Sequence, residues 1–238
     1  EAEENNLDDK AFEERWGRWH SCSLCKQDYH GVVRCALGWA CRKTYCSRPE
    51  TDWLRHKTMT VLGNGLVEAK RYAEALEVYQ ASLQDGEHLG LSLHDPYLDK
   101  CNIAVCYHRL GLPQEALSMQ REVYAAGLTL NLSPEDKAID AGNLADYLVA
   151  AREFKEAKSL LRKTIPTTLQ DLGPNHHTTL DIRGCYARAL SEDDSASRDD
   201  LVEAVAILEE VSQTARRIYG TGPAGLVVEE NKARLVRA

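Results

Sequence analysis

Five of the eight cysteines lie within residues 22–46, and their spacing points to metal chemistry. The run Cys22-x2-Cys25-x4-His30-x4-Cys35 offers two thiols on a tight turn, then an imidazole and a third thiol. Thiolate sulfur and imidazole nitrogen are ligands that Zn²⁺ prefers, and four of them close a tetrahedral structural site. A short segment that cannot build its own core gains most from a metal ion. We therefore predict one structural zinc ion, with Cys22, Cys25, His30 and Cys35 as its ligands.

Three other interpretations of these cysteines stay open. If residues 32–45 are helical, Cys35 and Cys41 are small apolar residues packed in a core. A disulfide would require an oxidising compartment, which nothing else in the sequence indicates. A redox-active Cys-x-x-Cys would require a βαβ context, and the pattern around it is helical. Outside this cluster we expect the thiols to pack between helices, at Cys101, Cys106 and Cys185.

The elements that must position these residues are indicated by a pattern that occurs four times. Each occurrence begins with a large residue that is followed directly by a small one. Another large residue lies three positions after the small one. Further along come an alanine and, four positions after it, a larger residue. The pattern begins at residues 62, 103, 144 and 186, in steps of 41, 41 and 42 residues. The four sets are Leu62-Gly63, Leu66, Ala75 and Tyr79; Ile103-Ala104, Tyr107, Ala116 and Gln120; Leu144-Ala145, Leu148, Ala157 and Leu161; and Tyr186-Ala187, Leu190, Ala204 and Leu208.

A repeat of this period predicts stacked helical hairpins. The small residues allow the two helices of a hairpin to approach, and the large ones fill the space between hairpins. One hairpin cannot bury its apolar face alone, so the hairpins must stack. Turns are expected at residues 70–72, 111–113 and 152–154, with Pro113 in a first helical turn. We therefore predict an all-α protein, a right-handed α-solenoid of helix pairs with an N-terminal Cys-rich cap.

The order and spacing of these residues resemble the tetratricopeptide repeat, with its Leu-Gly-x2-Tyr and Ala-x3-Phe pattern. The longer period here resembles the kinesin light chain type of repeat. Two further motifs carry this resemblance, the segment Leu172-Gly173-Pro174-Asn175-His176 and the triplet Asn143-Leu144-Ala145. It covers about residues 50–238. No heptad segment of the kind that light chains use to hold their heavy chain is present, so the repeat is transferred and the motor role is not.

The resemblance implies a peptide-binding groove lined by the first helix of each pair. Asn102 and Asn143 would face this groove, where an asparagine amide offers a donor and an acceptor to the backbone of an extended peptide. The neighbours one turn along are Asn64, Asp146 and Arg188. For each of these residues the alternative is an ordinary solvated position.

Four regions follow from these patterns. Residues 1–15 form an acidic flexible tail, residues 16–51 the Cys-rich cap, residues 52–222 the four helix pairs, and residues 223–238 a C-terminal capping helix. Within the cap we expect a helix over residues 11–19, an irregular segment over 21–31 and a second helix over 32–45. The pairs span 52–90, 95–131, 134–173 and 176–219. Residues 191–200, rich in serine and aspartate, are predicted to be a solvated loop.

Charge and motifs narrow the function. The net charge of −8 argues against nonspecific nucleic-acid binding, and no nucleophile elbow, phosphate loop or HExxH motif indicates an enzyme. We interpret His176-His177 as a helix start, because adjacent residues of a helix face apart. The sequence predicts a non-enzymatic interaction module or complex subunit that binds protein partners, in the cytoplasm or inside an organelle after leader removal. The alternative is a nucleic-acid-associated factor that uses a basic segment resembling a CCHC zinc knuckle, over residues 16–57.

Overall fold

The computed structural model describes residues 9–90 and 96–219, and over these residues the protein has ten helices and no strand, so the predicted all-α class is confirmed. The helices are α1 (Asp9–Gly17), α2 (Gly31–Tyr45), α3 (Trp53–Glu68), α4 (Tyr72–Leu89), α5 (Pro96–Arg109), α6 (Pro113–Thr129), α7 (Pro134–Ala150), α8 (Phe154–Leu172), α9 (His177–Ser191) and α10 (Arg198–Tyr219). Most of the predicted acidic tail and the predicted C-terminal capping helix over residues 223–238 lie outside the described residues.

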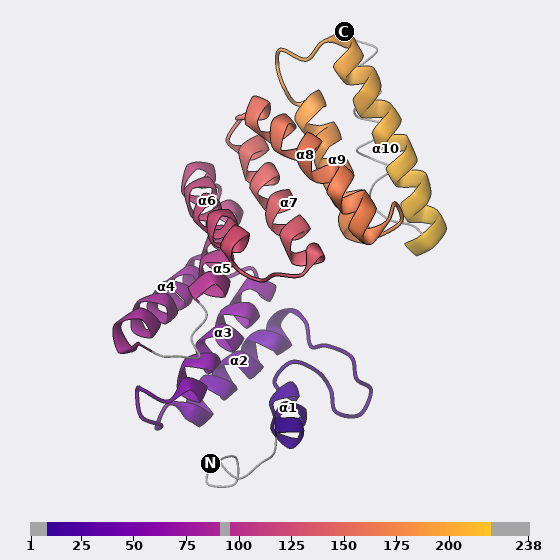
Figure 1. Ribbon diagram of the computed structural model, residues 1–238. Helices are drawn as coiled ribbons and strands as arrows, with labels where there is room; N and C mark the ends of the chain where they lie inside the picture. Colours follow the sequence, from indigo (N-terminus) through magenta and orange to yellow (C-terminus); the bar gives the residue numbers. More distant parts are fainter. Residues whose placement is uncertain (1–8, 91–95, 220–238) are drawn as a thin grey trace. The chain divides into compact units, whose positions relative to one another are not determined.

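The chain forms two compact units, which divide at Leu112/Pro113. The N-terminal unit contains α1 to α5, and the C-terminal unit contains α6 to α10. Within each unit, helices that follow one another in sequence pack together from α2 onward, and α7 also packs against α9 (Figure 1). None of the described helices is long and apolar enough to cross a membrane.

The repeated positions form the core. Of the 20 residues in the four sets, 19 are buried, and the remaining one, Tyr107, is half-buried. The small residue of the first set, Gly63, lies where a methyl group would come within 2.5 Å of the Tyr79 ring. The period therefore marks the residues that helices bury against one another, as the sequence predicted.

The turn between the two helices of a pair has the same backbone form three times. Lys70, Gly111 and Arg152, at intervals of 41 residues, have φ angles of 60°, 74° and 64°. In each turn the following amide donates to a carbonyl five residues earlier, and Arg71 N–H bonds to Leu66 O at 2.8 Å in the first. This is the left-handed helix end that satisfies terminal carbonyl groups. Each of the three predicted turns is confirmed.

The predicted cap helices are present, with shifted bounds. α1 ends at Gly17, two residues before the predicted end, and packs by Trp16 against Tyr45 of α2 and Leu54 of α3. Its aromatic residues also contact Lys57, whose Nζ lies 5.0 Å from the Trp16 ring centroid. α3 begins after Asp52, whose carboxylate accepts the Leu54 N–H and caps the helix.

Candidate functional site

Cys22 and Cys25 lie on an exposed hairpin-like turn between α1 and α2. Cys22 N–H donates to Gln27 O at 2.8 Å, and Lys26 N–H donates to Cys22 O at 2.9 Å. Lys26 has a left-handed φ of 60°. The amides of Cys25 and then Leu24 donate to the Cys22 sulfur, and these bonds lower the pKa of the Cys22 thiol. A thiol that ionises readily is suited to metal binding or to nucleophilic chemistry.

The other two predicted zinc ligands face elsewhere. Cys35 is buried in α2, where it accepts a long hydrogen bond of 3.8 Å from Arg71, and the exposed His30 ring lies 3.8 Å from Glu68. No three ligand atoms of this cluster lie within 4.8 Å of one another in the described part of the chain. The four residues therefore do not fit a zinc ion in this conformation, and the structural zinc stays a prediction.

Two of the predicted groove asparagines lie in the N-terminal unit. Asn64 on α3 is half-buried, and its Oδ1 accepts the Tyr79 hydroxyl at 2.6 Å. This bond satisfies the hydroxyl of a tyrosine that is otherwise fully enclosed, so the Asn64 oxygen has a structural role. Asn102 on α5 is half-buried.

The other three predicted residues line one pocket in the C-terminal unit. This pocket, of about 530 Å³, lies among α7, α9 and α10. Asn143 and Asp146 reach it from α7 and Arg188 from α9, beside the apolar residues Ile139 and Leu180. Residues four or three positions apart lie on one face of a helix, which is why Ile139, Asn143 and Asp146 converge. Its remaining lining residues include Leu208 and Val211 of α10, and no sequence pattern singled these out as groove residues.

The pocket is acidic on balance. Arg188 is the one arginine or lysine among its lining residues, and it is already paired, with Asp146 at 3.0 Å and with Glu192 at 3.3 Å. Asp181 adds a second lining carboxylate, and loss of hydration there raises the pKa of Asp181. Buried Cys185 completes one wall, and burial likewise raises the pKa of its thiol. An incoming group therefore meets apolar surface, an asparagine amide and excess negative charge.

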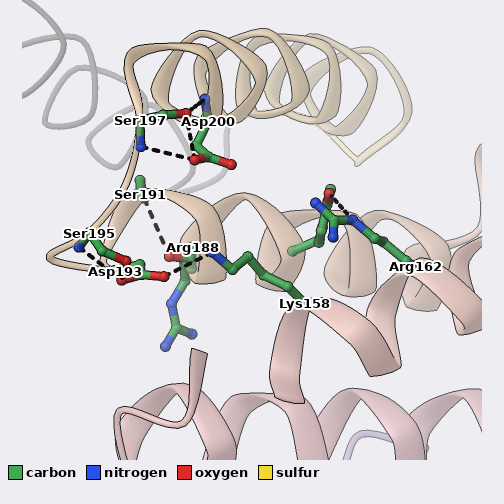
Figure 2. A network of polar contacts seen from close by, with 9 residues as sticks. Lys158, Arg162, Arg188, Ser191, Asp193, Ser195, Ser197 and Asp200 are labelled. Carbon is green, nitrogen blue, oxygen red and sulfur yellow. Dashed lines mark hydrogen bonds and ion pairs between the residues drawn. The ribbon is translucent and has the colours of Figure 1, made fainter. Parts of the chain in front are cut away.

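Residues 191–200 are mostly exposed or half-buried, as predicted, and polar contacts also hold the loop that joins α9 to α10 in place (Figure 2). Asp193 is buried, and its carboxylate accepts from Lys158 Nζ of α8 at 2.8 Å and from the Ser195 hydroxyl at 2.7 Å. Ser197 directly precedes α10, and its hydroxyl accepts the Asp200 N–H at 3.1 Å and caps the helix. The composition of residues 191–200 did not predict these contacts, because Lys158 lies 35 residues before Asp193 in the sequence.

Replacing Asp193 with asparagine is expected to destabilise the C-terminal unit by about 2 kcal/mol at pH 7, because it leaves Lys158 charged and enclosed. The Lys158 ammonium, followed by the Ser195 hydroxyl and amide, holds the pKa of the Asp193 carboxyl well below its usual range. The contribution of the Asp193 carboxylate to the free energy of unfolding is therefore complete above the unfolded-state pKa of about 4, and it is lost as the pH falls further. Urea unfolding at several pH values, followed by far-UV circular dichroism, measures the difference.

Asp194 is the matched control for this experiment. It is adjacent in sequence and pairs with Arg152, but its side chain is 81% exposed. Exposed pairs contribute about 0–1 kcal/mol, so Asp194→Asn should change the stability little at any pH. Equal effects of the two substitutions would show that the Lys158–Asp193 contact does not hold the loop.

Comparison with known proteins agrees with this architecture. The tetratricopeptide repeat family profile matches residues 141–178. A Podosopora anserina protein described as a kinesin light chain, with nearly identical TPR-like repeats, superimposes with a TM-score of 0.63 at 19% identity, over 79% of this chain and 88% of that one. A variant of that protein gives 0.65 at 19% identity, over 79% and 87%. BtubC (BKLC) from P. vanneervenii gives 0.53 at 15% identity, over 85% and 91%. No curated protein sequence matches the chain significantly.

These similarities and the helix pairing define an α-solenoid of tetratricopeptide-like helix pairs. Residues 141–178 match a tetratricopeptide repeat, and the fold is similar to that of kinesin light chain-like repeats. Such a fold supports a role as a protein-interaction scaffold, because stacked hairpins present extended surfaces. The family match covers the second part of α7, the turn to α8, α8 and the start of α9, and so it includes some of the residues that line the pocket, such as Asn143 and Asp146.

Proposed function

We propose that this protein is a non-enzymatic scaffold whose pocket among α7, α9 and α10 binds an extended segment of a protein partner. The observation that carries the proposal is the convergence of Asn143, Asp146 and Arg188 beside an apolar surface. An asparagine amide can donate to and accept from a peptide backbone, which offers the same two groups. The apolar residues between the helices suit an aliphatic side chain.

The charge of the pocket indicates which segment it would hold. Arg188 is paired with two carboxylates, so it is poorly placed to attract an acidic peptide. Among the lining residues, Arg188 is also the one arginine or lysine that could compensate the charge of Asp181. Complementary charge steers association and selects partners. We therefore expect the segment to carry a lysine or arginine next to an aliphatic residue.

A random-peptide display on the immobilised full chain tests this function. We expect enriched peptides to combine a basic and an aliphatic residue, and Asn143→Ala to weaken their binding about tenfold, as loss of about 1.4 kcal/mol would. Fluorescence anisotropy with a synthetic enriched peptide measures the change. Gln213→Ala is the control, because Gln213 is an exposed amide on α10 that does not line the pocket. Enrichment of acidic peptides, or equal binding by both variants, would contradict the proposal.

The nucleic-acid alternative has no contact in its favour. Three of the five arginines of the basic segment bond within the N-terminal unit: Arg42 donates to Arg55 O at 3.2 Å, Arg48 to Asp52 at 2.7 Å and Arg55 to Arg48 O at 2.9 Å. Binding through phosphates would weaken steeply with added salt. A cytoplasmic place of action is part of our proposal, and all eight cysteines are free thiols, as a reducing compartment requires.

A further inference from the structure

Two histidines and a glutamate meet at the N-terminal ends of α7 and α9. Glu135 lies in the first turn of α7, and His176 and His177 lie at the start of α9. Glu135 Oε1 is 3.5 Å from His177 Nε2 and 3.9 Å from His176 Nε2. One ligand atom from each of the three residues lies within 4.8 Å of the others, and no other group of three in the described chain does so.

The histidines converge because only one of them is helical. His176 is the N-cap residue of α9, with φ −68° and ψ 139°, and this extended backbone turns its side chain toward that of His177. The two ring centroids are 4.5 Å apart. The predicted helix start is confirmed, but the argument that adjacent residues face apart holds only inside a helix, and it was wrong for this pair.

The surroundings of the cluster are those of a binding site. His176 Nδ1 is buried without a hydrogen-bond partner, and a buried polar atom of this kind requires an explanation. Thr178 donates its hydroxyl to Glu135 Oε1 at 3.4 Å, which orients the carboxylate. Such outer contacts are what hold metal ligands in place.

We propose that Glu135, His176 and His177 bind a transition-metal ion of the zinc, cobalt or nickel class. Metal–ligand bonds of about 2.0–2.1 Å place tetrahedral ligand atoms roughly 3.3 Å apart, and the observed separations approach this value. Two imidazoles and one carboxylate suit these ions, whereas Ca²⁺ and Mg²⁺ prefer sites made of oxygen. The ion would join α7 to α9 and leave a coordination position for water or a partner's donor. Since His177 also lines the pocket, the ion would lie at its edge.

Cobalt binding to the full-length chain distinguishes this site from the cysteine cluster. The Cys22→Ser/Cys25→Ser double variant, treated with a chelator and then titrated with Co²⁺ in a calorimeter, is expected to bind one equivalent. Its absorption spectrum should lack the thiolate-to-cobalt charge-transfer band, because the ligands are nitrogen and oxygen. At a hundredfold excess over the dissociation constant, the ion should raise the unfolding midpoint of the C-terminal unit by roughly 5 °C or more.

Single substitutions in that background assign the ligands. Glu135→Gln and His177→Ala should each weaken Co²⁺ binding at least tenfold, while His108→Ala, in the N-terminal unit, should leave it unchanged. Glu135→Gln keeps the shape of the side chain and so remains informative if a histidine variant fails to fold. Binding that persists in both variants, or no binding in the double variant, would overturn the site and leave a histidine–glutamate ion pair. Peptide binding by the apo chain is measured separately, so failure here does not affect the proposed pocket.

Discussion

Alanine at Gly65 is expected to destabilise the N-terminal unit by about 3 kcal/mol, the upper end of the usual cost of overpacking. A methyl group there would lie 2.7 Å from Arg34 O and 2.9 Å from Cys35 Cα. Both atoms belong to the backbone of α2, so no side chain can move aside. A methyl group at Gly38 of α2 would in turn lie 2.9 Å from Leu62 Cα. These two glycines let α2 and α3 touch backbone to backbone, and this contact holds the Cys-rich segment of α2 against the first repeat helix.

The same substitution at Gly184 should have the opposite sign. Gly184 also lies within a helix, α9, but a methyl group there would have no neighbour within 4 Å. Alanine is favoured over glycine inside a helix by about 0.5–1 kcal/mol, so Gly184→Ala should stabilise the C-terminal unit. Urea unfolding followed by tryptophan fluorescence reports on the N-terminal unit, which holds all four tryptophans, and circular dichroism reports on both units. Equal effects at the two glycines would refute the close approach.

Trp16→Ala is expected to cost about 3–5 kcal/mol, the range for removing a large buried aromatic side chain. Trp16 is 5% exposed and packs against Tyr45, with ring centroids 5.7 Å apart. Together with Phe12 and Trp53 it also surrounds Lys57 Nζ, which lies 5.0–5.6 Å from the three ring centroids. Cation–π contacts add stability beyond the buried area. Denaturant unfolding followed by the remaining tryptophans measures the loss.

Trp39 provides the comparison for this variant. Its side chain on α2 is 48% exposed, so Trp39→Ala should cost under about 1 kcal/mol. If the two tryptophan variants were equally stable, α1 would not be an integral part of the N-terminal unit.

The fold was predictable because the period marks burial directly. Residues such as Leu66, Ala104 and Leu148 are apolar or small because they lie between helices, and the same requirement returns every 41 residues. The three turns were predictable for a similar reason, because they repeat one hydrogen-bonding pattern. Where the chain departs from the period, at residues 191–200, composition indicated an exposed loop but not the contact of Asp193 with Lys158.

The candidate site was predictable in part. Asn143, Asp146 and Arg188 came from resemblance to a known repeat, and they do line one pocket. Asn64 lies in the N-terminal unit, where its oxygen accepts the Tyr79 hydroxyl. The histidine pair was misjudged because the side-chain directions depended on whether His176 was helical. A one-residue uncertainty in a helix start changes such an argument completely.

The left-handed turns have a consequence for how the protein could change in length. Lys70 and Arg152 adopt a conformation that favours glycine, and glycine occupies the equivalent position at residue 111. Two non-glycine residues tolerate this kink, so its backbone path is set by the whole hairpin and not by the residue at the kink. A segment copied from one kink to the next would contain the second helix of one pair and the first helix of the next pair, which together make one full period of buried positions. Duplication or loss of such a segment would thus yield a longer or shorter protein whose buried positions keep their register, whereas a change by any length other than a whole period would shift that register.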